Sequence, residues 1–208
     1  MYIFFLQKKN YITDCWYVLL ESILQFKWKI SALQVPWSAV QEGFILNTDE
    51  SSMHQGTSAA GGGILRDYND SLIFAFSSFF GYGTNMCAES ISLMVGLSIC
   101  NMFQVKKVEV RVDSKVLIDI LNKKAMAPWH IQPLIRKISR YKHLVAGFVH
   151  CFRESNSVAD ALAKDAQHHR STKFFTSMSQ ISAQVRALIH MDTTRVCNFR
   201  FIKTSSYS

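Results

Sequence analysis

Four acidic residues lie at positions where a carboxylate is difficult to explain by packing alone. Asp49 and Asp113 each follow an apolar run, and Glu89 and Asp160 each lie within an apolar stretch of helical character. Carboxylates are almost never fully buried without a partner. Hard divalent cations take oxygen ligands, and a pair of such cations can hold a phosphodiester for hydrolysis. The pattern therefore predicts a two-cation site built from these four side chains.

The segments around the acidic residues predict an α/β fold that positions them. Thr84 and Ser114 are suitable caps for the two helices that follow them. The apolar patterns predict strands at residues 44–49, 59–66, 72–80, 108–112 and 145–152, and helices at 84–103, 114–121, 129–144 and 156–167. A meander of three strands followed by crossovers implies a five-stranded mixed sheet with helices on both faces.

Each acidic residue also has a structural explanation when it is taken alone. Asp49 and Asp113 could cap the ends of strands. Glu89 could be an early-helix glutamate that the helix dipole favours. Asp160 could lie on the polar face of an amphipathic helix. Their joint occurrence favours the cation site.

The composition indicates one domain with an extension at each end. Residues 1–43 form an apolar N-terminal extension, in which residues 16–26 resemble a helix. Residues 44–170 form the predicted domain, and residues 171–208 form a basic, partly disordered tail with a helical patch at 181–189. The formal charge is +8, of which five basic residues and one acidic residue place +4 in the tail. The charge is thus not concentrated in the domain, although it is compatible with a phosphate-rich partner.

The cysteines and the apolar runs predict the environment of the chain. The five cysteines form no Cys-x-x-Cys pair, which disfavours a zinc site or a disulfide framework and suits an intracellular, reducing compartment. The sequence does not distinguish nucleus from cytoplasm. Lys8 and Lys9 follow the first apolar residues too closely for a signal peptide, and no apolar run is long enough to span a membrane. We expect no membrane partner and a monomer.

Five short pieces of the sequence resemble, in order, a known domain family. They are Thr48-Asp49-Glu50-Ser51-Ser52, the run Ala59–Asp67, Thr84-Asn85 with Ala88-Glu89, Val112-Asp113-Ser114, and the run His150–Asp160 with Asn156 and Ala159-Asp160 in place. Together they resemble the type 1 ribonuclease H-like domain of plant retroelement-derived, reverse-transcriptase-like proteins. The resemblance covers about residues 44–167.

The resemblance implies a role for each acidic residue in binding two Mg²⁺ or Mn²⁺ ions. Asp49 would bridge both ions, Glu89 and Asp113 would complete one ion site, and Asp160 would complete the other. Carboxylates this close repel one another, so we expect raised pKa values in the cation-free site. His150 would assist proton movement and product release, and the alternative is a histidine that is only hydrogen-bonded on a strand.

The resemblance also implies an RNA–DNA hybrid as the nucleic-acid partner. The matching contact positions are Ser51, Thr84, Asn85, Asn156, Lys123, Lys124 and Trp129. The two lysines could equally be solvated, and Trp129 could equally belong to the core. Glu50 stands where the family has glycine, and residues 54–57 replace the family's Gly-Asn-Pro-Gly turn.

The leading functional prediction is an endoribonuclease that hydrolyses the RNA strand of RNA–DNA hybrids. The first alternative is a catalytically degenerate, domesticated domain that binds nucleic acid or a protein; Glu50 and the altered turn favour it. The second is a 3′–5′ exonuclease with carboxylate ligands, which requires Asp-x-Glu on the first strand. Here Glu50 comes one residue too early, on the opposite face of the strand.

Overall fold

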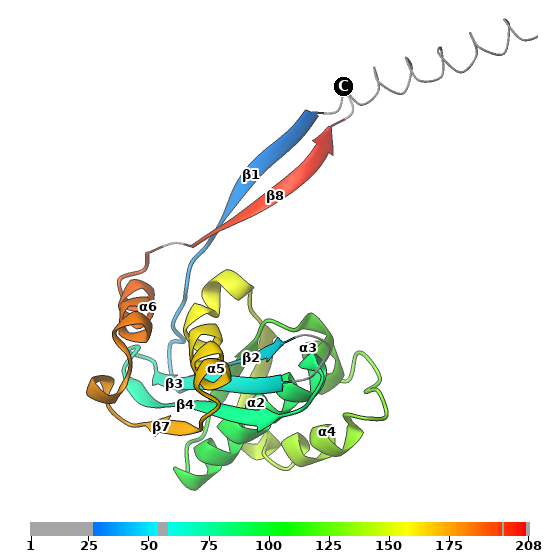
Figure 1. The fold of residues 1–208 in the computed structure, drawn as a ribbon, viewed down its shortest axis with the longest axis vertical. Helices are drawn as coiled ribbons and strands as arrows, with labels where there is room; N and C mark the ends of the chain where they lie inside the picture. Colours follow the sequence, from blue (N-terminus) through cyan, green and yellow to red (C-terminus); the bar gives the residue numbers. More distant parts are fainter. Residues whose placement is uncertain (1–26, 54–57, 197, 207–208) are drawn as a thin grey trace, which may run out of the picture. The chain divides into compact units, whose positions relative to one another are not determined.

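The computed structural model describes residues 27–53, 58–196 and 198–206, which belong to two units (Figure 1). The larger unit is Val35–Asn198, and the smaller unit joins Met1–Gln34 with Phe199–Ser208. The helix expected at residues 16–26, the turn at 54–57 and the last two residues of the tail lie outside the described residues.

The smaller unit contains a pair of strands that the sequence did not predict. Strand β1 (Lys27–Val35) pairs with β8 (Asn198–Ser206) in a two-stranded sheet. The Ser31 hydroxyl donates a hydrogen bond to the Ile202 carbonyl at 3.5 Å across this pair. The C-terminal segment expected to be part of a disordered tail therefore contains a strand.

The larger unit is organised around a mixed sheet of six strands, one more than predicted. The strand order is β6-β5-β2-β3-β4-β7. Strands β2, β3, β4 and β7 pair antiparallel, and β2, β5 and β6 pair parallel. Their bounds are β2 (Phe44–Met53), β3 (Ser58–Asp67), β4 (Leu72–Gly81), β5 (Val108–Val112), β6 (Val145–His150) and β7 (Lys173–Phe175).

The sixth strand, β7, comes from the segment expected to be a tail. Phe175 pairs with Ala75 of β4, and the ring of Phe174 lies 5.9 Å from Phe74 and 6.0 Å from Phe103. Pairing with β4 and contacts between aromatic rings thus hold these three residues, which are too few to show strand alternation in the sequence.

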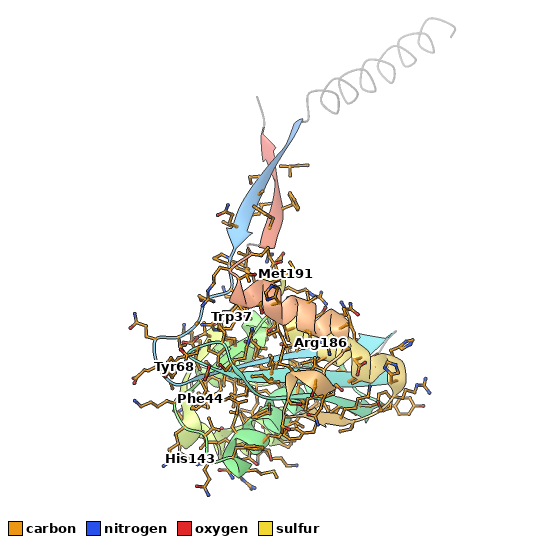
Figure 2. The ribbon with its side chains drawn as sticks, turned by 90° about the vertical axis from the view of Figure 1, so that its left-hand side faces the viewer. Trp37, Phe44, Tyr68, His143, Arg186 and Met191 are labelled. Atoms are coloured by element: carbon orange, nitrogen blue, oxygen red, sulfur yellow. The ribbon has the colours of Figure 1, made fainter. Side chains whose placement is uncertain are left out.

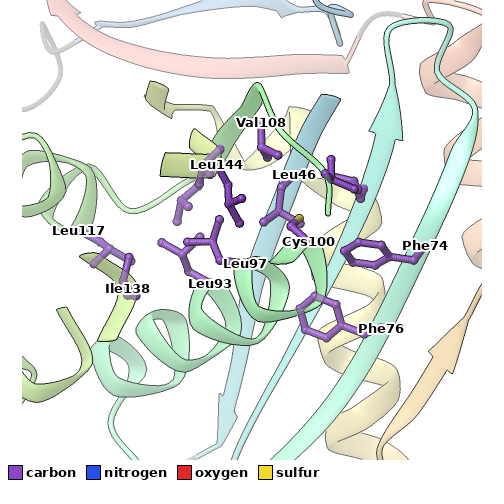
Figure 3. Packing of buried hydrophobic residues seen from close by; sticks show 14 of the residues in the cluster. Leu46, Phe74, Phe76, Leu93, Leu97, Cys100, Val108, Leu117, Ile138 and Leu144 are labelled. Atoms are coloured by element: carbon purple, nitrogen blue, oxygen red, sulfur yellow. The ribbon is translucent and has the colours of Figure 1, made fainter. Parts of the chain in front are cut away.

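Helices cover both faces of the sheet, as predicted (Figure 1). On one face lie α2 (Asn85–Met102), α3 (Lys115–Leu121) and α4 (Gln132–Ser139), and on the other lie α5 (Ser157–His169) and α6 (Ala183–Thr193). Figure 3 shows the core of the first face, in which Leu46 of the sheet meets Leu93 and Leu97 of α2. The second core joins Ile64 and Leu162 to residues of α6. Single 3₁₀ turns lie at η2 (Lys142–Leu144), η3 (Arg153–Ser155) and η4 (Met178–Gln180).

The predicted helix starts are confirmed, and one predicted helix is shorter than expected. Thr84 Oγ1 accepts a hydrogen bond from the Cys87 amide at 3.3 Å, and Ser114 Oγ accepts one from the Leu117 amide at 3.3 Å. The helix expected over 129–144 is α4 alone, Gln132–Ser139, followed by the turn η2. Pro133 stands in its first turn, where a missing amide hydrogen does not interrupt a helix.

A run of three glycines in β3 lets both helix layers approach the sheet closely. A Cβ atom added to Gly61 would lie 1.7 Å from Ser92 Oγ of α2, and one added to Gly62 would lie 2.4 Å from the Ala163 amide nitrogen of α5. Successive residues of a strand face opposite sides of the sheet, so the two glycines serve opposite faces. Gly62 pairs with Asp49, which places both close approaches beside the first acidic residue.

The boundaries predicted at residues 44 and 170 fall inside the larger unit. Arg66 of β3 and Asp192 of α6 form a buried ion pair at 3.0 Å. The ring of Trp37 lies 4.3 Å from the Arg66 guanidinium and 4.8 Å from that of Arg111. Figure 2 marks Trp37 and Met191, which come from the two segments that extend the predicted domain. Buried contacts on both sides therefore enlarge the domain.

Candidate active site

The structure brings the four predicted carboxylates together at one edge of the sheet. Asp49 lies on β2 and Asp113 directly follows β5, and these two parallel strands are aligned through the pair Asn47 and Arg111. Asp49 and Asp113 each come two residues after this aligned pair, so the two acidic residues lie at the same level along the strand direction. Glu89 comes from the second turn of α2, and Asp160 comes from the first turn of α5.

Burial and mutual repulsion raise the pKa values of Asp49, Glu89 and Asp113. Burial, followed by the charges of Asp113, Asp160 and Glu89, raises the pKa of Asp49 to about 8. Burial and the charge of Asp113 raise the pKa of Glu89 to about 8, against hydrogen bonds from Ser114. Burial is the main cause of a raised pKa at Asp113 as well. Asp49 and Glu89 therefore hold protons at neutral pH, because both are buried beside other carboxylates.

The free oxygens of the cluster fit hard divalent cations. Asp49 Oδ2, Glu89 Oε1 and Asp160 Oδ1 are buried and accept no hydrogen bond. Asp49 Oδ1 accepts from the Glu50 amide at 2.8 Å, which fixes its carboxylate. Among the described residues, no group of three or more His, Cys, Asp or Glu side chains forms a ready chelate for one ion.

Two cationic side chains that the sequence reasoning missed contact Asp160. Lys164 Nζ lies 2.6 Å from Asp160 Oδ2, and an Arg153 guanidinium nitrogen lies 3.7 Å from Asp160 Oδ1. Lys164 follows Asp160 by four residues in a helix, a spacing that predicts such a pair. Arg153 had no comparable signal, because it comes from the turn η3 before the helix.

Glu50, the residue after Asp49, places a fifth carboxylate near the same cluster. Burial raises the pKa of Glu50, and the charges of Asp113 and Asp160 raise it further against hydrogen bonding from Ser52.

His150 lies beside Asp113 at the end of β6. Its Nε2 atom is 3.1 Å from the Asp113 carbonyl oxygen, which can only accept, so Nε2 carries the hydrogen. The ring also makes an edge contact with Phe152 at 5.9 Å. His150 is thus both hydrogen-bonded at a strand end and adjacent to the cluster, so both sequence-based interpretations describe part of its geometry.

The predicted nucleic-acid contacts divide into three groups. Ser51, Thr84 and Asn85 lie at the rim of the cluster, where the Ser52 hydroxyl donates to Asn85 Oδ1 at 2.8 Å and joins β2 to the start of α2. Lys123, Lys124 and Trp129 are exposed on the connection between α3 and α4. No hydrogen bond, ion pair or ring contact among the described side chains joins these three to the carboxylates.

Asn156 alone forms the third group and needs correction, and for Trp129 the structure excludes one of the two alternatives. Trp129 is 83% exposed and is therefore not a core residue. Asn156 is 1% exposed, and its side chain bonds to β2 instead of facing a ligand. Asn156 stands at the N-cap position of α5, but its side chain does not cap that helix.

Within the described residues, no helix combines the length and the apolar character that a membrane crossing requires.

Comparison with known proteins agrees with this geometry. Residues 47–166, more than half of the chain, match the reverse transcriptase-like family. The chain is 30% identical over 135 residues to an Arabidopsis thaliana protein named "Putative ribonuclease H protein". That match covers 64% of this chain and 22% of the relative, so the chain spans about a fifth of the relative's length.

Solved structures show the same fold. LC11-RNase H1 in complex with an RNA/DNA hybrid superposes with a TM-score of 0.58 at 24% identity, covering 61% of this chain and 98% of that one. RNase H1 from the archaeon Halobacterium salinarum superposes with a TM-score of 0.54 at 25% identity, with the same coverage of 61% and 98%. The chain therefore belongs to the reverse transcriptase-like family, and its larger unit contains a ribonuclease H-like domain.

Proposed function

We propose that this domain is an endoribonuclease that hydrolyses the RNA strand of RNA–DNA hybrids with two Mg²⁺ or Mn²⁺ ions. The observation that carries the proposal is the convergence of four carboxylates, of which Asp49 and Glu89 are buried and Asp113 and Asp160 are half-buried; three of the four keep an oxygen without a hydrogen-bond partner. Structural ion-pair networks also shift pKa values, but they satisfy their oxygens with cationic partners. Asp49 and Glu89 have no ion pair among the described side chains.

The residues would divide the work of the site as follows. Asp49 would hold both cations, Glu89 and Asp113 would hold one, and Asp160 would hold the other. When bound, the cations would supply an activated water and stabilise charge on the leaving oxygen. His150, held at Nε2 by the Asp113 carbonyl, presents Nδ1 for proton exchange beside the cluster.

The choice of a hybrid substrate is supported by the relatives and by the rim of the site. The Arabidopsis relative is named as a ribonuclease H protein, and one structural neighbour was solved with an RNA/DNA hybrid. Proteins distinguish RNA from DNA strands through helix shape and 2′-hydroxyl contacts. Ser51, Thr84 and Asn85 offer hydroxyl and amide groups at the rim for such contacts.

Cleavage of an end-labelled RNA–DNA hybrid in Mg²⁺ or Mn²⁺ tests the proposal. We expect cleavage of the RNA strand alone. Asp113→Asn should lower the rate by about 100-fold or more, because a cation supplies several kcal/mol and each 1.4 kcal/mol is about tenfold. Asp119→Asn on α3 is the matched control, and it should retain the wild-type rate.

Two outcomes would contradict the proposal in different ways. Loss of activity in both Asp113→Asn and Asp119→Asn would mean that the loss follows from impaired folding and not from removal of a cation ligand. Cation binding by the wild-type protein without cleavage of any hybrid would instead select the binding-module alternative. The Lys164–Asp160 ion pair at 2.6 Å gives that alternative a physical basis, because it places a cationic group where a metal ion would bind.

A further inference from the structure

Two buried asparagines join β2 to α5 directly behind the carboxylate cluster. Asn47 is 3% exposed and Asn156 is 1% exposed. Asn47 Nδ2 donates to Asn156 Oδ1 at 3.0 Å, and Asn156 Nδ2 donates to the Thr48 carbonyl at 3.0 Å. We call this arrangement the asparagine clamp.

The chemistry of the clamp fixes its orientation. A backbone carbonyl can only accept a hydrogen bond, so the amide NH₂ of Asn156 must face Thr48. The amide oxygen of Asn156 then faces Asn47, which must present its own NH₂. Each of the two side chains therefore has one orientation that satisfies both hydrogen bonds, and the pair acts as a directional link between strand and helix.

Each asparagine of the clamp lies close in sequence to one of the acidic residues. Asn47 precedes Asp49 by two residues, so both side chains lie on the same face of β2. Asn156 precedes Asp160 by four residues, about one helical turn, and the Asp160 amide donates to the Asn156 carbonyl at 3.1 Å. The link thus connects the backbone that carries Asp49 to the backbone that carries Asp160.

Stability alone does not explain a polar pair at this position. Burying an amide costs free energy unless its groups are hydrogen-bonded, and Asn47 Oδ1 is buried without a hydrogen-bond partner. An apolar pair of similar size would avoid that cost but would lack direction. We propose that Asn47 and Asn156 are positioning residues that set the separation of Asp49 and Asp160 for cation binding. This inference rests on the proposed function.

The test compares clamp variants with a matched control on the same helix. The clamp variants are Asn47→Ala, Asn156→Ala and their double variant. The control is Gln167→Ala, because Gln167 is also a buried amide and donates from Nε2 to Ser58 Oγ at 2.8 Å near the other end of α5. Mn²⁺ affinity is measured by calorimetry and hybrid cleavage by initial rates, at a temperature where circular dichroism shows every variant folded.

We expect each clamp variant to bind Mn²⁺ about 10–100-fold more weakly, the usual effect of losing a group that orients a metal ligand. The kcat for hybrid cleavage should fall with little change in KM. The double variant should bind Mn²⁺ with about the same affinity as the more weakly binding single variant, because either single change already breaks the link. Gln167→Ala should lower the Tm by a comparable amount but keep Mn²⁺ affinity within about twofold of wild type.

Several results would overturn the proposal. Wild-type affinity in both single clamp variants would show that the clamp does not position the carboxylates. Equal weakening in Gln167→Ala would show that the affinity follows helix stability alone. A wild-type protein that binds no Mn²⁺ would also contradict the clamp's role, whereas one that binds Mn²⁺ without cleaving hybrid would contradict only the proposed function.

Discussion

At the scale of single residues, Asp49 and Glu89 are protonated at neutral pH, and a bound divalent cation would displace these protons. Burial is the largest cause of the raised pKa at both Asp49 and Glu89, and repulsion from Asp113 comes next. Each of these carboxyls is ionised in the unfolded chain above about pH 4–5. In the folded, cation-free protein they keep their protons up to a pKa of about 8. The folded state therefore binds more protons over this range, and its stability falls as the pH rises towards 8.

Glu89→Gln should consequently stabilise the cation-free protein at neutral pH. The variant removes a group whose ionisation opposes folding, and we expect a Tm about 2–4 °C above wild type at pH 7.5, equivalent to roughly 1 kcal/mol. The difference should vanish near pH 4, where both states are protonated. Thermal melts in a chelator measure it, with the exposed Glu42→Gln as the control. A lower Tm for Glu89→Gln across the whole range would contradict this account of the pKa shift.

The residue types of the site were predictable from the sequence, but its surroundings were not. Each of the four acidic residues interrupts an apolar pattern, and such an interruption is visible without a structure. Arg153 reaches the cluster only because the turn η3 brings it beside Asp160. That feature depends on the placement of the chain in space, so periodicity could not reveal it.

At the scale of elements, close helix packing on β3 determines how α5 presents Asp160. Gly62 lies opposite Asp49, and a methyl group there would meet the Ala163 amide nitrogen and the Leu162 side chain of α5. Both are in the rigid part of the helix, so relief requires a shift of α5 itself. A shift of α5 moves Asp160 away from the other carboxylates.

Gly62→Ala should therefore damage stability and the site together. We expect a loss of about 1–3 kcal/mol, the usual cost of overpacking. Gly147→Ala in β6 is the control, because no atom lies within 4 Å of its added Cβ. Urea unfolding measures both variants. Equal stability of the two would show that α5 adjusts without cost.

Element prediction succeeded where a pattern was long and failed where it was short. The hairpin of β3 and β4 and the caps Thr84 and Ser114 were predictable, because alternation and capping chemistry are local. Strand β7 has three residues, and its order depends on a contact with Phe74 that is distant in sequence. No local signal identifies such a strand.

At the scale of the larger unit, a buried ion pair holds the C-terminal segment to the sheet. Burial raises the pKa of Asp192 to about 6 although Arg66 and Arg195 lower it, so Asp192 is ionised at neutral pH. Arg66 is 1% exposed, and it would remain buried without its main counter-charge if Asp192 were lost. The partners are 126 residues apart in sequence, which explains why the predicted boundary at residue 170 came too early.

Asp192→Ala should unfold at markedly lower urea concentration than wild type. Removing one partner of a buried ion pair typically costs about 3–5 kcal/mol. Lys107→Ala is the control, because its ion pair with Glu42 is exposed and such pairs contribute about 0–1 kcal/mol. A loss in Asp192→Ala no larger than in the control would mean that water reaches Arg66 and satisfies it.

The surroundings of Trp37 give the protein an intrinsic optical probe. Its ring is 3% exposed and lies against the guanidinium groups of Arg66 and Arg111, whereas Trp129 is 83% exposed. Indole emission shifts to longer wavelength in water, so the two rings emit at different wavelengths in the folded protein. In a variant with Trp16, Trp28 and Trp129 all replaced by Phe, a red shift of the Trp37 emission would report the separation of α6 from the sheet without any added label.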